Sequence, residues 1–149
     1  MELDPSSFET TKECEATAML YFNGLFDQIV NILEDQTKTN LAISRAIKKI
    51  GIAKMGLMMI SFGTIARHYQ YNVFKYEKDI MSKDDDFFMH NKSNALFQGI
   101  DTDDLDLFRR LWKPSKSCRD SFDEDEKEII WIYIHTIYLS IKRWIKLNN

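Results

Sequence analysis

Residues 123–144 read DEDEKEIIWIYIHTIYLSIKRW, and this stretch decides the fold class. An acidic tip leads into an apolar, aromatic segment and then into a basic end. The apolar residues recur at intervals of three and four, which predicts an α-helix with one buried stripe. A helix that is apolar over more than half its girth is either central to a core or offers one face to a partner. The stripe and the residues that widen it are Ile130, Ile134, Ile137, Ile141, Trp144 and Ile145, with Trp131, Tyr133 and Tyr138.

The same spacing predicts which of these side chains are buried. Trp131 and Ile134 are expected inside the core or across a homodimer, whereas His135 is expected at the surface, on the polar side of the helix. Because truncation of a buried tryptophan costs about 3–5 kcal/mol, Trp131 should matter for stability far more than His135.

The charges at the two ends of this helix fit its dipole. Ser121 and Glu124 have the spacing of a capping box, in which each side chain covers a free backbone N–H. The acids of residues 123–126 lie at the positive end, and the bases Lys142, Arg143 and Lys146 lie at the negative end. These charges are therefore interpreted first as groups that stabilise the two ends of the helix, and only second as a binding site.

The opening segment predicts a first long helix. Ser6 and Glu9 again have capping-box spacing, and EDQTKTN, residues 34–40, ends the pattern. Apolar residues between them recur at helical intervals and predict one buried face. They are Ala18, Phe22, Leu25, Ile29 and Leu33.

The middle of the chain predicts further helices. One begins near Leu41 and is expected to break or bend at Gly51, and residues 52–74 follow a helical pattern again. Gly56 and Gly63 would lie two turns apart on one face, where they would let another helix approach closely. Each glycine weakens a helix by up to about 1 kcal/mol relative to alanine, so packing must compensate for this loss of stability.

The segment between residues 77 and 122 reads as a polar connector with short helices. Gly99 marks a turn, and Asp101 or Thr102 can cap a short helix that ends near Trp112. Five glycines and two prolines leave little material for the tight turns of a sheet. The prediction is an all-α fold, a single helical domain over residues 1–149 with about five helices and a long, apolar C-terminal helix.

Charge limits the class of partner. The net charge is −3, whereas a dedicated nucleic-acid binder usually has a basic face and a high pI. Charge is nevertheless uneven, because residues 37–76 contain no acid but include the bases of the segment Lys38–Lys75. This segment either complements neighbouring acidic helices or forms a basic face for an acidic partner or nucleic acid. Its early part has no interleaved aromatic residue, which makes nucleic acid the weaker hypothesis.

The sequence offers no set of residues for catalysis, a metal or a cofactor. The acidic runs at residues 84–86 and 101–106 lack the glycine and spacing of a calcium loop. His68, His90 and His135 do not have the spacing of a helical metal site. Cys14 and Cys118 form no C-x-x-C pair and are expected to be reduced. The protein is predicted not to be an enzyme.

No targeting or membrane segment is predicted. The acidic, polar start lacks the features of a secretion signal. The apolar run Met55–Ala66 is shorter than the roughly 18 residues that a span requires, so it is interpreted as a buried helix.

The second half of the chain contains three short motifs in order: KDDDFF from Lys83, LFQGID from Leu96 and KEIIWIY from Lys127. These motifs resemble the acidic KDD-FF element, the LFPGID turn and the K-x-x-IW-x-YL helix of a family of small helical proteins of large nucleocytoplasmic DNA viruses. This chain departs from it at Gln98 and Ile134, and residues 42–66 match nothing in the family. The matching positions are Lys83, Asp84, Asp85, Phe87 and Phe88; Leu96, Phe97, Gly99, Ile100 and Asp101; and Lys127, Ile130, Trp131 and Tyr133.

The resemblance implies a viral, intracellular, helical protein of the host cytoplasm or the virion, without catalytic residues. The residues themselves favour a packing unit, in which large apolar side chains fold the acidic loop back onto the last helix. These side chains are Phe87, Phe88, Phe97, Ile100, Trp112, Trp131 and Tyr133.

The leading functional hypothesis is a non-enzymatic viral protein that acts through protein–protein contacts, in virion assembly or in the infected cytoplasm, with a viral or host partner or a second copy. One alternative is a viral Bcl-2-like bundle that binds host BH3 or innate-signalling partners, with Met55–Tyr69 as its central helix, although the NWGR signature is missing around Gly56. A second alternative is a nucleic-acid-associated protein that uses the segment Lys38–Lys75. The candidate interface residues are Met55, Met59, Phe62, Trp131, Tyr138 and Trp144.

Overall fold

A computed structural model describes residues 3–36, 41–85, 87, 112 and 123–149. Within these residues the chain forms α-helices and short 3-10 helices and no strand, so the prediction of an all-α fold with about five helices and a long C-terminal helix is confirmed. The elements are η1 (Pro5–Ser7), α1 (Thr11–Gln36), α2 (Leu41–Met59), α3 (Phe62–Asn72), η2 (Phe74–Tyr76), α4 (Glu77–Met81) and α7 (Glu124–Asn148).

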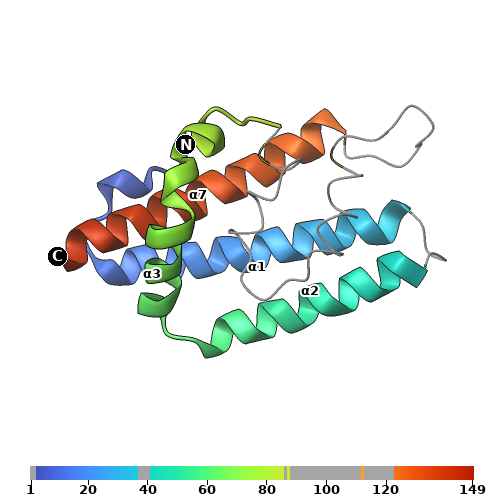
Figure 1. Cartoon of the computed structure of the whole chain (residues 1–149), viewed down its shortest axis with the longest axis horizontal. Coiled ribbons are helices and arrows are strands. Elements are labelled where there is room, and N and C mark those ends of the chain that lie inside the picture. Colours follow the sequence, from blue (N-terminus) through green and yellow to red (C-terminus); the bar gives the residue numbers. More distant parts are fainter. Residues whose placement is uncertain (1–2, 37–40, 86, 88–111, 113–122) are drawn as a thin grey trace.

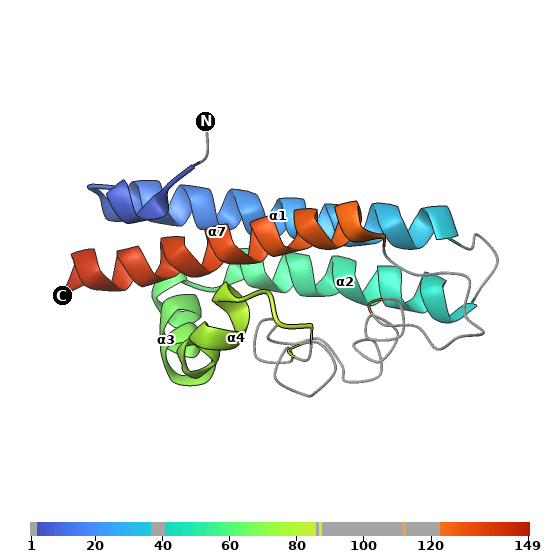
Figure 2. The same ribbon diagram turned by 90° about the horizontal axis from the view of Figure 1, so that it is seen from above.

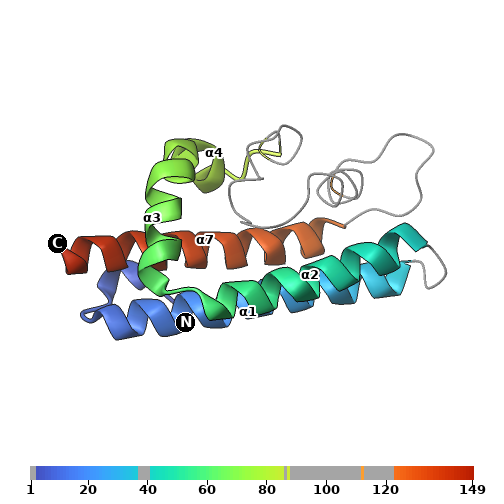
Figure 3. The ribbon, with the colours of Figure 1, turned by 60° about the horizontal axis from the view of Figure 1, so that its bottom comes forward.

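Three long helices run side by side along the molecule, as Figures 1 and 2 show. Helix α1 runs antiparallel to both α2 and α7, and it contacts both of them. Helix α3 turns away from the end of α2 and crosses α7, and it leads to α4 on the far side of α7 (Figure 3). Helix α7 therefore lies between α1 on one side and α3 with α4 on the other.

The burial of α7 follows the predicted stripe. Trp131 is 3% exposed and Ile134 is 2% exposed, so both are buried as predicted, and within the chain itself. The partner residues on α1 are those of the predicted stripe, including Phe22, Leu25 and Ile29. Two helices with complementary apolar stripes bury them against each other, and α1 and α7 form the centre of this core.

The expectation of a surface position for His135 is wrong. Its side chain is half-buried, and its Nε2 lies 2.6 Å from the carbonyl oxygen of Ile80, to which an Nε2–H can donate. The imidazole ring also lies 5.8 Å from the Trp131 ring. Helix α4 covers this side of α7, and such tertiary cover cannot be read from the period of a single helix.

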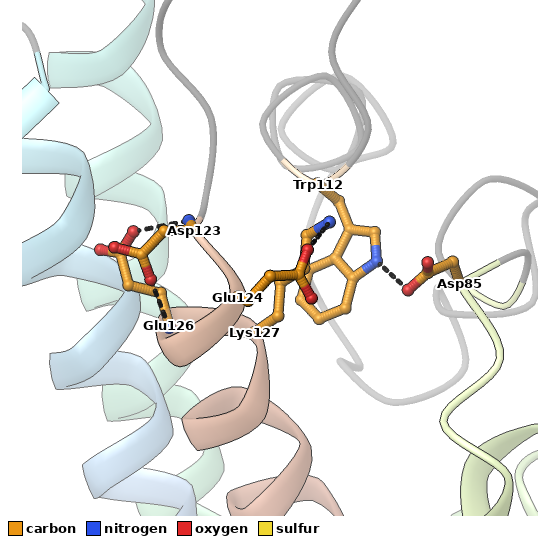
Figure 4. Close-up of polar contacts among 6 residues, drawn as sticks. All are labelled: Asp85, Trp112, Asp123, Glu124, Glu126 and Lys127. Carbon is orange, nitrogen blue, oxygen red and sulfur yellow. Dashed lines mark hydrogen bonds and ion pairs between the residues drawn. The ribbon is translucent and has the colours of Figure 1, made fainter.

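Both predicted capping boxes are displaced along the chain. Helix α7 is capped by Asp123, which accepts from the backbone N–H of Glu126, while the Glu126 carboxylate accepts from the N–H of Asp123 (Figure 4). The predicted pair Ser121 and Glu124 is not the cap, and Ser121 lies outside the described residues. Asp123 and Glu126 have the same capping-box spacing as the predicted pair, and aspartate is as favourable at the N-cap as serine.

Helix α1 begins at Thr11, four residues after the end of η1, so Ser6 and Glu9 do not cap it. Thr10 does, because its hydroxyl accepts from the N–H of Glu13 at 3.2 Å and donates to the Glu13 carboxylate at 3.1 Å. Ser6 lies in η1, where its N–H donates to Asp4. Pro5 favours this short turn because its fixed φ suits a first helical position.

The predicted break at Gly51 is also wrong. Helix α2 runs unbroken through Gly51, and the chain bends by 112° between Met59 and Phe62 instead. Ser61 caps α3 there by accepting from the N–H of Thr64 at 3.2 Å. A single glycine weakens a helix without ending it, whereas a capping serine starts a new one.

The stretch Met55–Ala66 is therefore not one buried helix. Nothing lies within 4 Å of a Cβ built at Gly56, so this glycine does not admit a neighbouring helix. At Gly63 the nearest contact is the Trp144 ring at 3.9 Å, which is ordinary packing distance. The close approach occurs at Gly24 of α1, where a Cβ would lie 2.8 Å from Cε1 of Tyr133.

The predicted folding of aromatic side chains onto the last helix is confirmed for Phe87 and Trp112, the two of these residues before the last helix that the structure describes. Phe87 and Trp112 are fully buried, with ring centroids 6.3 Å and 5.8 Å from that of Trp131. The Trp112 indole N–H donates to Asp85 (Figure 4). Tyr133 instead faces α1, where its ring lies 5.5 Å from that of Tyr21. The predicted elements at Phe88, His90, Phe97, residues 99–106 and Cys118 lie outside the described residues.

Candidate protein-docking surface

The outer face of α2 exposes large apolar side chains. Met55 is 67% exposed and Met59 is 84% exposed, and Ile52 and Met58 are exposed as well. Ile52, Met55 and Met59 form, with Arg45 and Lys48, what we call the α2 stripe, whose residues are three and four positions apart along one side of the helix. Met58 lies beside this stripe. The α2 stripe comprises Arg45, Lys48, Ile52, Met55 and Met59.

The opposite face of α2 already supplies the core. Ala46 and Ile50 are buried, and Ile47 and Leu57 pack against the core from its edge. The helix is thus apolar on two sides, and only one of them is covered. Contiguous exposed apolar side chains mark an interaction surface more often than isolated ones do.

Charge divides the bases of α2 into two groups. Lys54 binds Asp27 of α1, with Nζ 2.8 Å from Oδ1, so part of the basic segment complements a neighbouring acidic helix. Arg45 and Lys48 are exposed at the beginning of the α2 stripe. Lys54 therefore fits the alternative of internal charge complementarity, whereas Arg45 and Lys48 fit the alternative of an outward basic face.

Two of the six candidate interface residues belong to the core. Trp131 and Tyr138 are covered by the chain itself, with exposed fractions of 3% and 1%. The Tyr138 ring packs on that of Phe74, and burial raises the pKa of its hydroxyl, which also bonds the Glu77 carboxylate. A side chain that its own fold covers offers no surface to a partner, so these two are removed from the candidate interface.

Two more candidates join α7 to its neighbours. The rings of Phe62 and Trp144 lie 5.5 Å apart, and the Trp144 indole N–H donates to Glu15 of α1 at 3.1 Å. Both are half-buried at the crossing of α3 and α7. Of the six predicted residues, only Met55 and Met59 lie together on the exposed stripe.

A second exposed apolar surface lies between α1 and α7, at residues that are not among the six predicted interface residues. This groove has a volume of about 470 Å³, and Leu20, 68% exposed, stands at its α1 edge. One signal could have found it, since Leu20 lies off the buried stripe of α1 and Ile129 and Ile132 lie off that of α7. The α1–α7 groove is lined by Leu20, Tyr21, Gly24, Ile129, Ile132 and Tyr133.

The N-terminal end of the α1–α7 groove, at the start of α7, is acidic. Asp125 precedes Ile129 by one turn, and Glu128 precedes Ile132 by one turn, so each acid is a neighbour of a groove residue on the helix surface. Glu128 also binds Lys83. The groove and the α2 stripe therefore carry opposite charge beside similar apolar surfaces.

Within the described part of the chain, no group of three or more His, Cys, Asp or Glu side chains is placed to hold a metal ion. Cys14 is a buried free thiol whose pKa is raised by that burial. Across the same residues no single helix is long and apolar enough to cross a membrane, while α2 and α3 pass that test together as a bent pair.

Comparison with known proteins gives no match. No protein-family model matches the chain, and neither a curated protein nor a solved structure is significantly similar to it. The resemblance to the virus family therefore stays a prediction.

Proposed function

We propose that this chain is a non-enzymatic interaction module that binds a protein partner through the α2 stripe. The observation that carries the proposal is the exposure of Met55 and Met59 on a helix whose other face is in the core. Burial of apolar surface is favourable, so covering this stripe contributes to association. Methionine side chains adapt to irregular partner surfaces because they are unbranched and polarisable.

The charge of the stripe describes the partner. Arg45 and Lys48 stand at one end of the apolar residues, so a fitting partner has an apolar surface with acidic residues at one end. In the viral setting that the resemblance implies, such a partner would be a virion protein or a protein of the infected cell.

The Bcl-2-like alternative has less support from the geometry of the stretch that it would use as its central helix. It requires one buried helix over Met55–Tyr69, but this stretch belongs to two helices bent by 112°, and its methionines face outward. For the nucleic-acid alternative, the exposed bases of α2 are followed by Ile52 and Met55. Single-stranded nucleic acids bind on aromatic rings that stack with bases, so this surface suits a protein better.

A capture experiment tests the proposal. The tagged chain and its Met55→Ser/Met59→Ser variant are incubated with lysate from cells that express the chain, and bound proteins are quantified. Tyr71→Ser, which changes an exposed aromatic residue of α3, is the matched control. The wild type and the control should retain the same partners and the double variant should lose them, with helical content equal by circular dichroism. Equal retention by all three would refute a docking role for the stripe.

A further inference from the structure

We propose that the partner of the α2 stripe is a second copy of this chain, whose α1–α7 groove receives the stripe. The inference rests on the proposed function, since it names the partner of the same surface. It starts from two exposed apolar surfaces of opposite charge on one molecule, the α2 stripe and the α1–α7 groove. The stripe has bases beside its apolar side chains, and the groove has acids beside its apolar side chains.

The spacing of the stripe fits a helix that lies in a groove. Ile52, Met55 and Met59 follow the i, i+3, i+7 pattern with which an amphipathic helix places its anchors. The receiving groove offers about 470 Å³ between two helices, with apolar side chains on both walls. A helix in a groove needs both features, and the chain carries one on α2 and the other between α1 and α7.

The register of charge and apolar residues matches as well. Lys48, Ile52 and Met55 have spacings of four and three, and so do Asp125, Ile129 and Ile132 on the wall of the groove. When the incoming α2 lies parallel to α7, Lys48 meets Asp125 and two apolar pairs align at successive turns of about 5.4 Å. Like surfaces do not fit in this way: paired in parallel, stripe on stripe sets base against base and groove on groove sets acid against acid, and paired antiparallel, the bases of one stripe face the apolar end of the other and have no acidic partner.

The contact is heterologous, because different surfaces of the two copies meet. An open assembly of this kind has a free stripe at one end and a free groove at the other, so association continues until a ring closes or a filament grows. A symmetric dimer would instead use one surface twice. A mixture of two variants that each lack one surface therefore distinguishes this heterologous contact from non-specific association.

The test uses two variants that each keep one surface intact. Met55→Ser/Met59→Ser removes the stripe, and Leu20→Ser/Ile132→Ser removes the groove at exposed positions. Analytical ultracentrifugation of the purified full chain should show wild-type species that grow with concentration from the 17.6 kDa monomer. Each variant alone should remain a monomer. Their equimolar mixture should double the monomer mass and grow no further, because one stripe and one groove remain to pair.

A charge exchange keeps the test decisive if a serine variant fails to fold. Lys48→Glu and Asp125→Lys should each weaken association severalfold, and the two changes in one chain should recover it. A wild type that stays monomeric at high concentration would overturn the self-docking proposal, as would a variant mixture that stays monomeric or a groove variant that still dimerises alone. Loss of captured partners by the stripe variant would then leave the proposed function standing, which separates the two claims.

Discussion

Gly24 and Gly51 occupy helical positions with opposite surroundings. A Cβ at Gly24 would lie 2.8 Å from Cε1 of Tyr133, whereas a Cβ at Gly51 would meet nothing within 4 Å. Gly51→Ala should raise stability by up to about 1 kcal/mol through helix propensity alone. Gly24→Ala should lower the melting temperature, because the Tyr133 ring that it displaces rests edge-on against Tyr21. Thermal melts followed by circular dichroism compare the two.

The background variant Tyr133→Ala separates the two effects at Gly24. Without the ring, Gly24→Ala should stabilise the helix as Gly51→Ala does. Equal stabilisation by both alanines in the wild-type background would contradict the close approach of α1 and α7 at this point.

Trp131 and His135 stand one turn apart on α7 and should differ in what their removal costs. Trp131 is buried among the rings of Phe87 and Trp112, so Trp131→Ala should cost about 3–5 kcal/mol of a total of about 5–15. His135→Ala removes one hydrogen bond to the Ile80 carbonyl and should cost about 0.5–1.5 kcal/mol. Urea denaturation measures both, with Tyr71→Ala as an exposed control. Small, equal changes for both would mean that the core at α7 is misplaced.

At the scale of elements, an ion pair holds α4 to α7. Lys142 binds the Glu77 carboxylate, and this bond holds the pKa of Glu77 below its ordinary value of 4.5. A carboxylate with a lowered folded-state pKa stabilises the fold above its unfolded pKa, and the stabilisation is lost as pH falls through the folded value. Because both side chains are about half exposed, the pair is worth at most about 1 kcal/mol.

Glu77→Gln should therefore lower the free energy of unfolding at neutral pH and match the wild type at pH values well below 4.5. Urea titrations across this range measure the gap. In a Lys142→Gln background the gap should be small at every pH, since the partner is absent. A gap that persists unchanged into acid would show that the glutamine acts by something other than loss of this pair.

The elements could be predicted from sequence to different degrees. Helix α7 follows its apolar period closely, because it is buried on the side that the period marks. Helix α2 could not be placed in this way, since a helix with apolar residues on both faces does not reveal which face the core covers. The sequence pattern does not predict the break after Met59. Ser61 can be recognised as the N-cap of α3 only once the preceding helix is known to end before it.

At the scale of the whole molecule, the candidate site depends on which surfaces remain uncovered. Helical apolar spacing predicts Met55, Met59, Trp131 and Tyr138 alike as interface residues. Only the two methionines are exposed, because the two aromatic residues lie in the core. The α1–α7 groove was missed because its walls come from helices about a hundred residues apart in the chain. Single-helix periodicity predicts an apolar face, and only the assembled fold decides whether that face is core or surface.

Partner binding should cover the α2 stripe, and methyl resonances of labelled methionine measure this directly. Spectra are recorded while unlabelled chain, and then captured partner, is added to the labelled chain. We expect Met55, Met58 and Met59 to shift or broaden together while Met19, which packs on the core, and Met81 of α4 keep their positions. Resonances of α2 that stay fixed with both additions, or changes centred on Met19 and Met81, would contradict this expectation.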